Sequence, residues 1–537
     1  MKNTSKNKHR HIDKYKHINK HKHINKYKGT RRNRSKKDKL HISEGGAAFI
    51  RGGYGCIFRP AIDCVGRKSK SNYISKLMKN DYAKREYEYI TKIDSRLHKL
   101  PTEVKKYLLL ENIELCEPGK LSDDDLKNIE TTCGDILTHV IDTSTKKHIT
   151  SGTINSNLDK FKIINMPELG ISLYDYLESN KMTPNELIEF NNIIIDYLIK
   201  VIPQISKNGV VHGDIKAANI LFSKENIKIP VLIDWGLSYV TNIDKKGIPE
   251  DFYKLKIQWQ HPFSTFLFSI DMAVQYISFL NNLKREKIKI TRESLRIFVI
   301  ALFSDFKKLH TRVYNILKHI FVNTYEGDLL KYVKDSTPSA SMTMAEQMFS
   351  NYFINYLLDI LMVYTTNIGS AGSAGDVGDN VLELNKYFND VYLYNVDIWG
   401  IMSIFYQYLL SSSTKFNMTN NEYKTFTSKT MTILVDNIFT NGHKIIDTGK
   451  LVSNIRSLNL YLKGIRENRD KPGLLHIKDK LKSSEISGNT LFFKSIEDSI
   501  RLRKTQLHHI DNRGIRRTLK VGGRYKANIR GTRRNNR

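Results

Sequence analysis

The residues best suited to chemistry form one run, His212-Gly213-Asp214-Ile215-Lys216-Ala217-Ala218-Asn219. The aliphatic residues 210–211 precede this run and the apolar segment 220–222 follows it, so the pattern predicts a loop held between two buried elements. Fifteen residues after Asn219, the apolar residues 231–233 lead into Asp234-Trp235-Gly236. Transfer of a phosphoryl group requires a carboxylate to orient a hydroxyl, a nearby cation, and Asn and Asp oxygens to hold a divalent metal.

A second set of candidates lies earlier in the chain. Residues 52–55 (Gly-Gly-Tyr-Gly) form a glycine-rich turn whose backbone is able to approach phosphate oxygens closely, with the aromatic ring as a lid. Lys76 follows Gly55 by twenty-one residues, at the end of a β-prone run. Glu86, on the next predicted helix, flanks an apolar stripe at residues 89, 90 and 93 and is expected to reach Lys76. Glu88 is the competing partner for the lysine.

Each of these features, taken alone, is also typical of an ordinary turn or surface residue, and only their order along the chain favours phosphoryl transfer. The elements that position them are predicted from hydrophobic periodicity and turn residues. We expect strands at 48–50, 56–58 and 72–76, a helix at 82–97, helix, loop and further strands at 101–160, a long helix at 183–208, strands at 220–222 and 230–233, and mostly helix at 263–388 and 391–462, with a flexible linker at 369–379.

The segments HGDIKAANILF and IDWGL resemble the catalytic and metal-binding loops of the eukaryotic-type protein kinase superfamily. The resemblance covers residues 45 to about 262 and resumes at Asp397-Ile398-Trp399-Gly400, which is similar to the central helix of the kinase C-lobe. The combination GGYGCIFRP, ISKLM and HGDIKAANI further resembles the Ser/Thr kinases of giant nucleocytoplasmic large DNA viruses. The abundance of Lys, Asn and Ile suits an AT-rich genome of that kind.

The resemblance implies ATP as phosphoryl donor, Mg²⁺ as cofactor and a role for each matched residue. Asp397 is expected to tether the backbone of the catalytic loop. The implied catalytic residues are Asp214 as base, Lys216 on the transferring phosphoryl group, and Lys76 paired with Glu86; the implied nucleotide-binding residues are Gly52, Gly53, Tyr54, Gly55, Lys76, Met166 and Glu168; and the implied metal ligands are Asn219 and Asp234.

Four positions depart from the pattern of the family. Ile50 stands where the first glycine of the phosphate-binding turn is usual, and Trp235 replaces the usual Phe. Gly213 replaces the arginine that binds an activation-loop phosphate, so we expect activity that does not depend on such a phosphate. No A-P-E follows the activation segment, and residues 260–263 (Gln-His-Pro-Phe) are the nearest counterpart.

The resemblance implies an α+β, bilobal, protein-kinase-like fold. The kinase domain is expected at 44–470, with a small β-rich N-lobe at 44–165 and a helical C-lobe at 171–470. A long helical insertion occupies about 263–390 of the C-lobe, as a packing elaboration or a docking surface. Residues 1–43 are predicted to be a disordered basic tail, and residues 471–537 a C-terminal extension with a second basic tail.

The charge of the chain is concentrated in these ends. The chain has 86 Lys and Arg against 55 Asp and Glu, a formal net charge of +31. Residues 1–40 carry a net +14 and residues 501–537 a net +12, which leaves about +5 for the 460 residues between them. Basic segments of this kind bind nucleic acid or acidic partners by releasing counterions, although they also occur simply as solvated tails.

Cysteine content and hydropathy suggest a cellular location. The four cysteines are few and scattered, without C-x-x-C spacing, so reduced thiols are expected. The N-terminus lacks a signal peptide's apolar segment, and no apolar run reaches the ~20 residues that span a bilayer. We therefore expect an intracellular protein of the host cytoplasm that does not insert into membranes, with packaging in the virion as an extension of that prediction.

The expected function is ATP-dependent phosphorylation of Ser/Thr hydroxyls in a protein substrate. Two alternatives stay open. The glycine of His212-Gly213-Asp214 also resembles small-molecule phosphotransferases of the aminoglycoside and choline kinase type, whereas Lys216 two residues after Asp214 is the pattern of the Ser/Thr protein kinases. The third hypothesis is a pseudokinase scaffold that its basic tails hold on nucleic acid.

Overall fold

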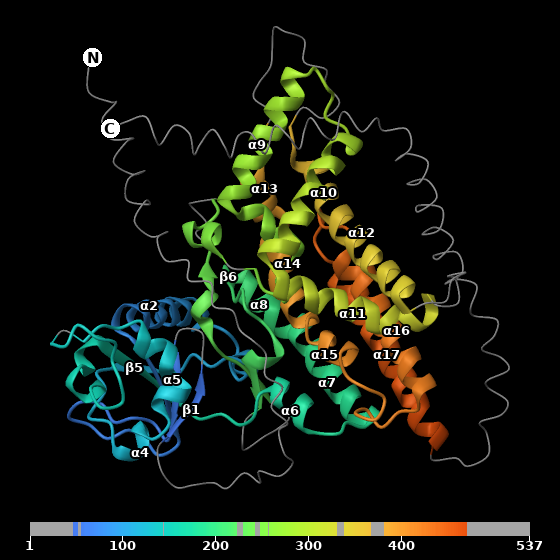
Figure 1. Cartoon of the computed structure of the whole chain (residues 1–537). Helices are drawn as coiled ribbons and strands as arrows, with labels where there is room; N and C mark the ends of the chain where they lie inside the picture. The colour runs from blue at the N-terminus through green and yellow to red at the C-terminus, as the bar shows by residue number, and fades with distance from the viewer. Residues whose placement is uncertain are drawn as a thin grey trace, which may run out of the picture.

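A computed structural model describes most of the middle of the chain, and Figure 1 shows its two parts. The described residues are 47–51, 55–142, 144–222, 229–241, 247–255, 257–329, 338–366 and 381–469. The β-rich part, drawn in blue to teal, lies beside a larger helical part, drawn in green to red (Figure 1). The predicted α+β, bilobal kinase-like class is therefore confirmed. Within the described ranges, no helix has the length and apolar character needed to cross a membrane.

Five antiparallel strands form the sheet of the first part. Their order across the sheet is β1-β2-β3-β5-β4, so β3 is central. Residues alternate between buried and partly exposed along β2 and most of β3, as expected for strands with two different faces. The strands are β1 (Ala47–Arg51), β2 (Gly55–Arg59), β3 (Tyr73–Lys79), β4 (Glu114–Cys116) and β5 (Phe161–Pro167).

Helix α2 (Asn80–Leu97) follows β3 directly and packs on one face of this sheet. Its buried residues are Ala83, Glu86, Ile90, Ile93 and Leu97, which recur at the three- and four-residue spacing of one helix face. The predicted strands and the predicted helix at 82–97 are confirmed, with the helix beginning two residues earlier. Glu86 is the one charged residue on the buried face of α2, and it therefore points toward the sheet.

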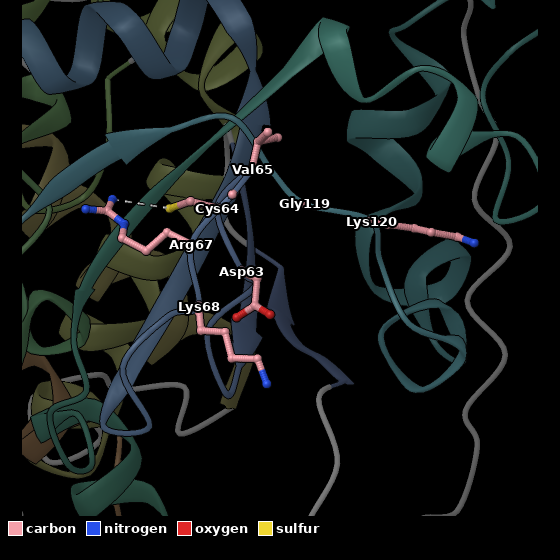
Figure 2. A pocket seen from close by; sticks show the side chains of 8 residues that line it. Asp63, Cys64, Val65, Arg67, Lys68, Gly119 and Lys120 are labelled. Atoms are coloured by element: carbon pink, nitrogen blue, oxygen red, sulfur yellow. Dashed lines mark hydrogen bonds between the residues drawn. The ribbon is translucent and has the colours of Figure 1, made fainter.

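Short helices α3 (Thr102–Lys105), α4 (Asp123–Leu126) and α5 (Ile129–Thr138) lie between α2 and β5. Helix α5 contacts β1 and β2, and its apolar residues join those of β2 and β5 in a separate small core. The loop after β2 and the residues after β4 line a surface pocket in which Asp63, Lys68, Gly119 and Lys120 take part (Figure 2).

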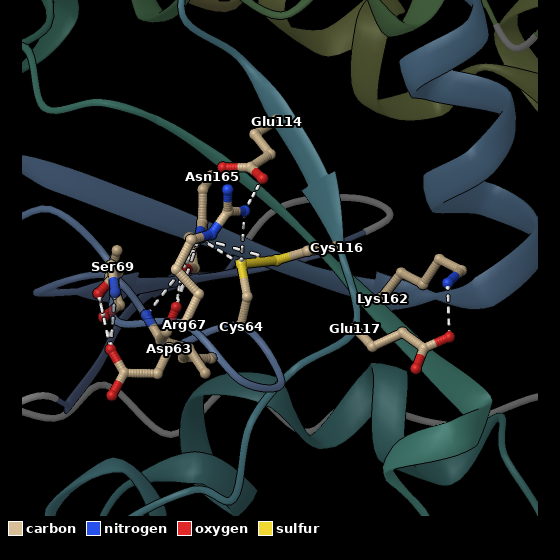
Figure 3. Close-up of a disulfide and its surroundings, with 12 residues drawn as sticks. Asp63, Cys64, Arg67, Ser69, Glu114, Cys116, Glu117, Lys162 and Asn165 are labelled. Carbon is tan, nitrogen blue, oxygen red and sulfur yellow. Dashed lines mark hydrogen bonds and ion pairs between the residues drawn. A yellow bond between two sulfur atoms is a disulfide. The ribbon is translucent and has the colours of Figure 1, made fainter.

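Two disulfides cross-link this part of the molecule. Cys56 of β2 is joined to Cys133 of α5, and Cys64 to Cys116 of β4, with Cα atoms 5.5 and 5.8 Å apart respectively. Figure 3 shows the second bond beside the buried amide of Asn165. The prediction of reduced thiols is therefore wrong. The sequence spacing misled because the sheet brings together cysteines that lie 77 and 52 residues apart.

The helical part begins with α6 (Leu173–Ser179) and a long, nearly continuous helix. That helix comprises α7 (Pro184–Asp196), the π-helical turn η3 (Tyr197–Val201) and α8 (Ile202–Lys207). Thr183 and Glu186 form a capping box at its N-terminus, and Pro184 occupies the first turn. It ends before Gly209, whose φ of 69° favours glycine. The predicted helix at 183–208 is confirmed.

Short strand pairs follow and carry the loops between them. β6 pairs with β9, and β7 pairs with β8, both antiparallel. The 3₁₀ turn η4 (Ala217–Asn219) precedes β7, and η5 (Trp235–Leu237) follows β8, so both candidate loops are held by pairing of the strands beside them. The bounds are β6 (Val210–Val211), β7 (Ile220–Phe222), β8 (Pro230–Leu232) and β9 (Tyr239–Val240).

Helices fill most of the remaining described chain. They cover the region predicted as an insertion, where α11 and α12 pack against each other and α10 packs on α12. Phe263, of the 3₁₀ segment η7 (Phe263–Phe268), stacks on Phe439 and meets Trp399 edge to face, which joins this region to the rest of the helical part. The helices are α9 (Ile270–Arg285), α10 (Arg292–Leu309), α11 (Thr311–Leu329), α12 (Pro338–Tyr364) and α13 (Leu384–Tyr387).

The last described helices complete the body. Helix α17 lies along α7, and α14 runs through the centre, where all but its first two residues are buried. The helices are η8 (Phe388–Tyr392), α14 (Leu393–Met402), α15 (Phe405–Leu409), α16 (Asn420–Leu434), η9 (Val435–Phe439) and α17 (Thr448–Arg469). The predicted tails at 1–43 and 471–537 and the predicted linker at 369–379 lie outside the described residues.

We predict that the unreduced protein has no titratable thiol. Denatured without reductant, it should leave all four cysteines unmodified by an alkylating reagent, and peptide mapping should recover the 56–133 and 64–116 cross-links. Reduction, or Cys133→Ser, should lower the free energy of unfolding by about 2–5 kcal/mol, because each bond restricts the unfolded chain. Four alkylated thiols in the freshly purified protein would contradict the pairing.

Candidate active site

The backbone of the loop after β6 is held by a buried carboxylate. Asp397 of α14 accepts hydrogen bonds from the backbone N–H groups of His212, at 2.9 Å, and Gly213, at 2.8 Å. Burial raises the pKa of Asp397 to about 6, and the two N–H groups act in the opposite direction. The predicted tether between α14 and the catalytic loop is therefore confirmed.

Two glycines allow this close approach. Gly213 has a φ of 74°, and a Cβ there would lie 2.8 Å from the carbonyl oxygen of Leu237. A Cβ on Gly400 of α14 would lie 2.7 Å from the carbonyl oxygen of Ile215. Both positions exclude a side chain, which explains physically why glycine rather than the usual arginine precedes Asp214.

The imidazole ring of His212 is neutral and holds the loop through two hydrogen bonds. Its Nε2–H donates to the carbonyl of Ile233 at 3.1 Å, and its Nδ1 accepts from the backbone N–H of Asp214 at 3.2 Å. These partners assign the Nε2–H tautomer. Burial lowers the pKa of His212 to about 4. A proton on Nδ1 would displace the N–H of Asp214, so the loop requires the uncharged ring.

The predicted catalytic residues of this loop lie in contact. One carboxylate oxygen of Asp214, Oδ2, accepts from Lys216 Nζ at 2.7 Å and from Asn219 Nδ2 at 3.0 Å. Asn219 Nδ2 also donates to the backbone carbonyl of Asp214 at 2.8 Å. The loop thus folds back on itself through side chains separated by two and five residues.

A second cluster joins the sheet to the helical part. Lys76 Nζ lies 2.6 Å from Glu86 Oε1 and 3.4 Å from Asp234 Oδ1. Burial opposes the charge on Lys76, but Asp234 and Glu86 outweigh it and raise the pKa of the lysine above its ordinary value. Burial raises the pKa of Glu86, and the Lys76 ammonium acts against that shift. Glu88 is exposed, so the structure selects Glu86 as the partner.

Asp234 immediately precedes the η5 turn and has a left-handed backbone, at φ 65°. Lys76 lowers the pKa of its carboxyl group, and the side chain is 40% exposed, in contrast to 12% for Lys76 and 9% for Glu86. Asp234 therefore has an ionised carboxylate that pairs with Lys76 through Oδ1 and is the most exposed of the three side chains. Its charge also interacts with Lys216 and His212, which places it beside the catalytic loop.

The donor set suits Mg²⁺. The amide nitrogen of Asn219 donates to Asp214, so the amide oxygen is the atom of this side chain that is able to bind a metal. Asp234 provides a carboxylate as a second oxygen ligand. Mg²⁺ prefers oxygen ligands and is typically held by one or two protein groups together with water and substrate phosphates. The described ranges contain no group of three or more His, Cys, Asp or Glu side chains arranged for a metal.

Of the predicted nucleotide-binding residues, Gly55, Lys76, Met166 and Glu168 are among those that the structure describes. Gly52, Gly53 and Tyr54 lie outside the described residues. Gly55 begins β2, and a Cβ there would lie 2.9 Å from both Lys76 Cγ and Met78 Cγ, so glycine lets β2 pass close to the lysine.

Met166 and Glu168 lie at the connection between the two parts. Met166 pairs with Ile74 in the sheet, and Glu168 forms an ion pair with Arg59. The backbone N–H of Glu168 donates to the carbonyl of Asn72 at 2.8 Å, so this N–H is not available to donate a hydrogen bond to the adenine ring of a nucleotide. The pocket of Figure 2 contains neither this connection nor Lys76, Asp214 or Asp234 and is a separate surface feature.

Two further residues contact the catalytic loop without having been identified from the sequence. Gln260 Nε2 donates to Asp214 Oδ1, and His261 Nε2–H donates to the carbonyl of Gly213 at 3.1 Å. Both belong to residues 260–263, the nearest counterpart of the A-P-E motif in this sequence, and that position was the available signal. Trp235, which replaces the usual Phe, is buried: its ring lies 4.7 Å from that of His212, and its Nε1–H donates to the carbonyl of Leu109.

Comparison with known proteins identifies a matching family. A sequence model of the phosphotransferase enzyme family, which belongs to the protein kinase-like superfamily, matches residues 91–243. This span contains the catalytic loop and Asp234 but begins after Lys76 and Glu86. No curated protein matches the chain. The match indicates transfer of a phosphoryl group to a hydroxyl, for which ATP is the implied donor, typically with Mg²⁺.

We predict that Gly400→Ala destabilises the protein and lowers its activity. The added methyl group meets the Ile215 backbone and forces α14 away from the catalytic loop, at a cost of about 1–3 kcal/mol in the free energy of unfolding. Gly464→Ala is the matched control, because that α17 position has nothing within 4 Å of the added Cβ. It should stabilise by about 0.5–1 kcal/mol. Equal effects of the two changes in urea denaturation would contradict this packing.

We also predict that His212 makes stability depend on pH. Its pKa is 6.5 in the unfolded chain and about 4 in the folded protein, so the unfolded state binds more protons between these values. The free energy of unfolding therefore falls as pH decreases, with a contribution of about 2 kcal/mol between pH 7 and pH 5.

His212→Asn, which keeps an acceptor for the Asp214 N–H, should remove that contribution from urea denaturation curves. His148→Asn, at an exposed position, is the control and should leave the pH dependence unchanged. An unaltered pH dependence in His212→Asn would show that the ring is not held neutral.

Proposed function

We propose that this protein transfers the γ-phosphoryl group of ATP to Ser or Thr hydroxyls of a protein substrate. The observation that carries the proposal is the convergence of two clusters on one site. Asp214, Lys216 and Asn219 lie within hydrogen-bond distance of one another, and Lys76, Glu86 and Asp234 form an ion-pair group whose open carboxylate faces the same loop.

Asp214 is the proposed base. Its carboxylate is fixed by donors on both oxygens, as a group that orients a hydroxyl and takes its proton must be. Lys216 is the proposed partner of the transferring phosphoryl group, and it carries its charge beside that carboxylate. The arrangement supplies positioning and charge stabilisation, which are the main requirements of this reaction.

Lys76 is the proposed ligand of the α- and β-phosphates. Because Glu86 holds its ammonium group at 2.6 Å, the lysine is positioned before nucleotide binds. Asn219 and Asp234 are the proposed ligands of Mg²⁺, which when bound neutralises charge on the phosphates.

Two observations bear on the acceptor. Lys216 two residues after Asp214, and Asp397 anchoring the loop from α14, favour a protein kinase. A small-molecule hydroxyl is the second candidate, because the matching family model is that of a phosphotransferase family and Gly213 stands in the middle of His-Gly-Asp. The basic ends of the chain support a further proposal, that they bind nucleic acid or an acidic partner.

We predict that Asp214→Asn reduces phosphoryl transfer from radiolabelled ATP by about 10²–10⁴-fold, because the base is lost. Lys76→Met should instead weaken nucleotide binding. Asp271→Asn, at an exposed position of α9, removes the same charge outside the site and should keep wild-type activity.

The acceptor is identified by parallel assays with casein-type protein and with a panel of hydroxylated metabolites. Radiolabel recovered as phosphoserine or phosphothreonine supports the protein kinase. Label recovered only in a metabolite would favour the second candidate, and full activity of Asp214→Asn would overturn the site.

A further inference from the structure

Gln260 makes an unusual contact with the proposed base. Its side chain is buried, at 1% exposure, in the segment that follows the activation loop. Nε2 donates to Asp214 Oδ1 and also to Gln258 Oε1, the latter at 3.0 Å. Turning the amide over would set its carbonyl oxygen against two acceptors, so the chemistry of the partners fixes its orientation.

The segment is attached to the catalytic loop at a second point. His261 donates from Nε2–H to the carbonyl of Gly213 at 3.1 Å and accepts at Nδ1 from the backbone N–H of Gln258 at 3.3 Å. The ring is therefore the neutral Nε2–H tautomer, and burial lowers its pKa to about 4. Both attachments therefore use uncharged side chains of this segment, the amide of Gln260 and the imidazole of His261.

Gln260 completes the set of donors around Asp214. Lys216 and Asn219 both donate to Oδ2, and among the described residues Gln260 is the donor to Oδ1. The carboxylate plane of an Asp turns easily about its last torsion. Donors on a single oxygen leave that rotation open, whereas donors on both oxygens restrict it.

We propose that Gln260 is a positioning residue that fixes the plane of the Asp214 carboxylate from the segment after the activation loop. The inference rests on the proposed function. It also provides a reason why this chain works without an arginine before Asp214: hydrogen bonds from Gln260 and His261 join the segment to the catalytic loop in the place of a phosphate–arginine pair. The buried Oε1 of Gln260 accepts no hydrogen bond within the described ranges, so its two donated bonds alone hold the amide.

The charged and titratable groups around Asp214 determine what a substitution of Gln260 does to the pH dependence of activity. Lys216 lies on the same loop, and His212 and His261 are neutral rings that contact it. The carboxylates of other elements near this loop are Asp397, which binds its backbone, and Asp234, which interacts with Lys216. A carboxylate at position 260 would lie against Asp214, and the two acids would then retain a shared proton to higher pH.

The test is the pH profile of kcat for phosphoryl transfer by the full-length protein. Gln260→Glu keeps the shape of the side chain but exchanges the donor for a second carboxylate. We expect a 10- to 100-fold loss of kcat at pH 7, an acid limb moved upward by at least one pH unit, and partial recovery at high pH. Gln347→Glu, at an exposed position of α12, adds the same charge outside the site and should match the wild type.

A neutral variant at the same position separates the loss of the hydrogen bond from a general loss of folding. Gln260→Met should lower kcat about tenfold, leave the KM for ATP within twofold and leave the acid limb where it is in the wild type. A wild-type pH profile in Gln260→Glu, or a raised kcat in Gln260→Met, would overturn the inference, the second because the contact would then block the base. If Asp214→Asn is inactive while both Gln260 variants resemble the wild type, only this inference fails. Full activity of Asp214→Asn would instead remove the proposed function itself.

Discussion

The structure of the site depends on one buried interaction, the carboxylate of Asp397 accepting the N–H groups of His212 and Gly213. These groups would otherwise be buried donors without partners, each at a cost of about 1–3 kcal/mol. Ser238 Oγ donates to the carbonyl of His212 at 2.9 Å and holds the same peptide from its other side. Because the loop backbone is fixed in this way, the Cα and Cβ atoms of Asp214 have a defined position. The contacts of its carboxylate with Lys216, Asn219 and Gln260 then orient the side chain.

The second constraint connects the two parts of the molecule. Lys76 comes from the central strand of the sheet, Glu86 from the helix packed on it and Asp234 from the turn after β8. A buried group of this kind is costly unless each charge is paired, and here the lysine is shared by two carboxylates. The disulfide from Cys56 to Cys133 restrains β2, the neighbour of the lysine strand, from the opposite side of the sheet. The lysine is therefore held in a part of the molecule that is covalently braced as well as packed.

The departures from the kinase pattern form a consistent set. Gly213 has no room for a side chain beyond its Cα, so an arginine is physically excluded at that place. The neighbouring segment compensates with Gln260 and His261, which reach the same loop with neutral hydrogen bonds. Trp235, the larger ring, fills the space between His212 and the carbonyl of Leu109. Substitutions that look independent in the sequence are thus neighbours around one loop.

Local pattern determined strands β1, β2 and β3, the helix that carries Glu86, the long helix capped by Thr183 and the loop at 212–219, because each depends on periodicity, capping or turn residues within a short stretch. Strands β4 and β5 were not placed by it. Resemblance to a known family supplied the roles proposed for Asp214, Asn219 and Asp234. Three features needed the folded chain: the disulfides, the choice of Glu86 over Glu88, and the contact of Gln260 with Asp214. In each case the two residues in contact lie 10 to 77 positions apart in the sequence, and strand order and helix packing bring them together. No local pattern in the chain encodes such distances, which is why only tertiary packing specifies them.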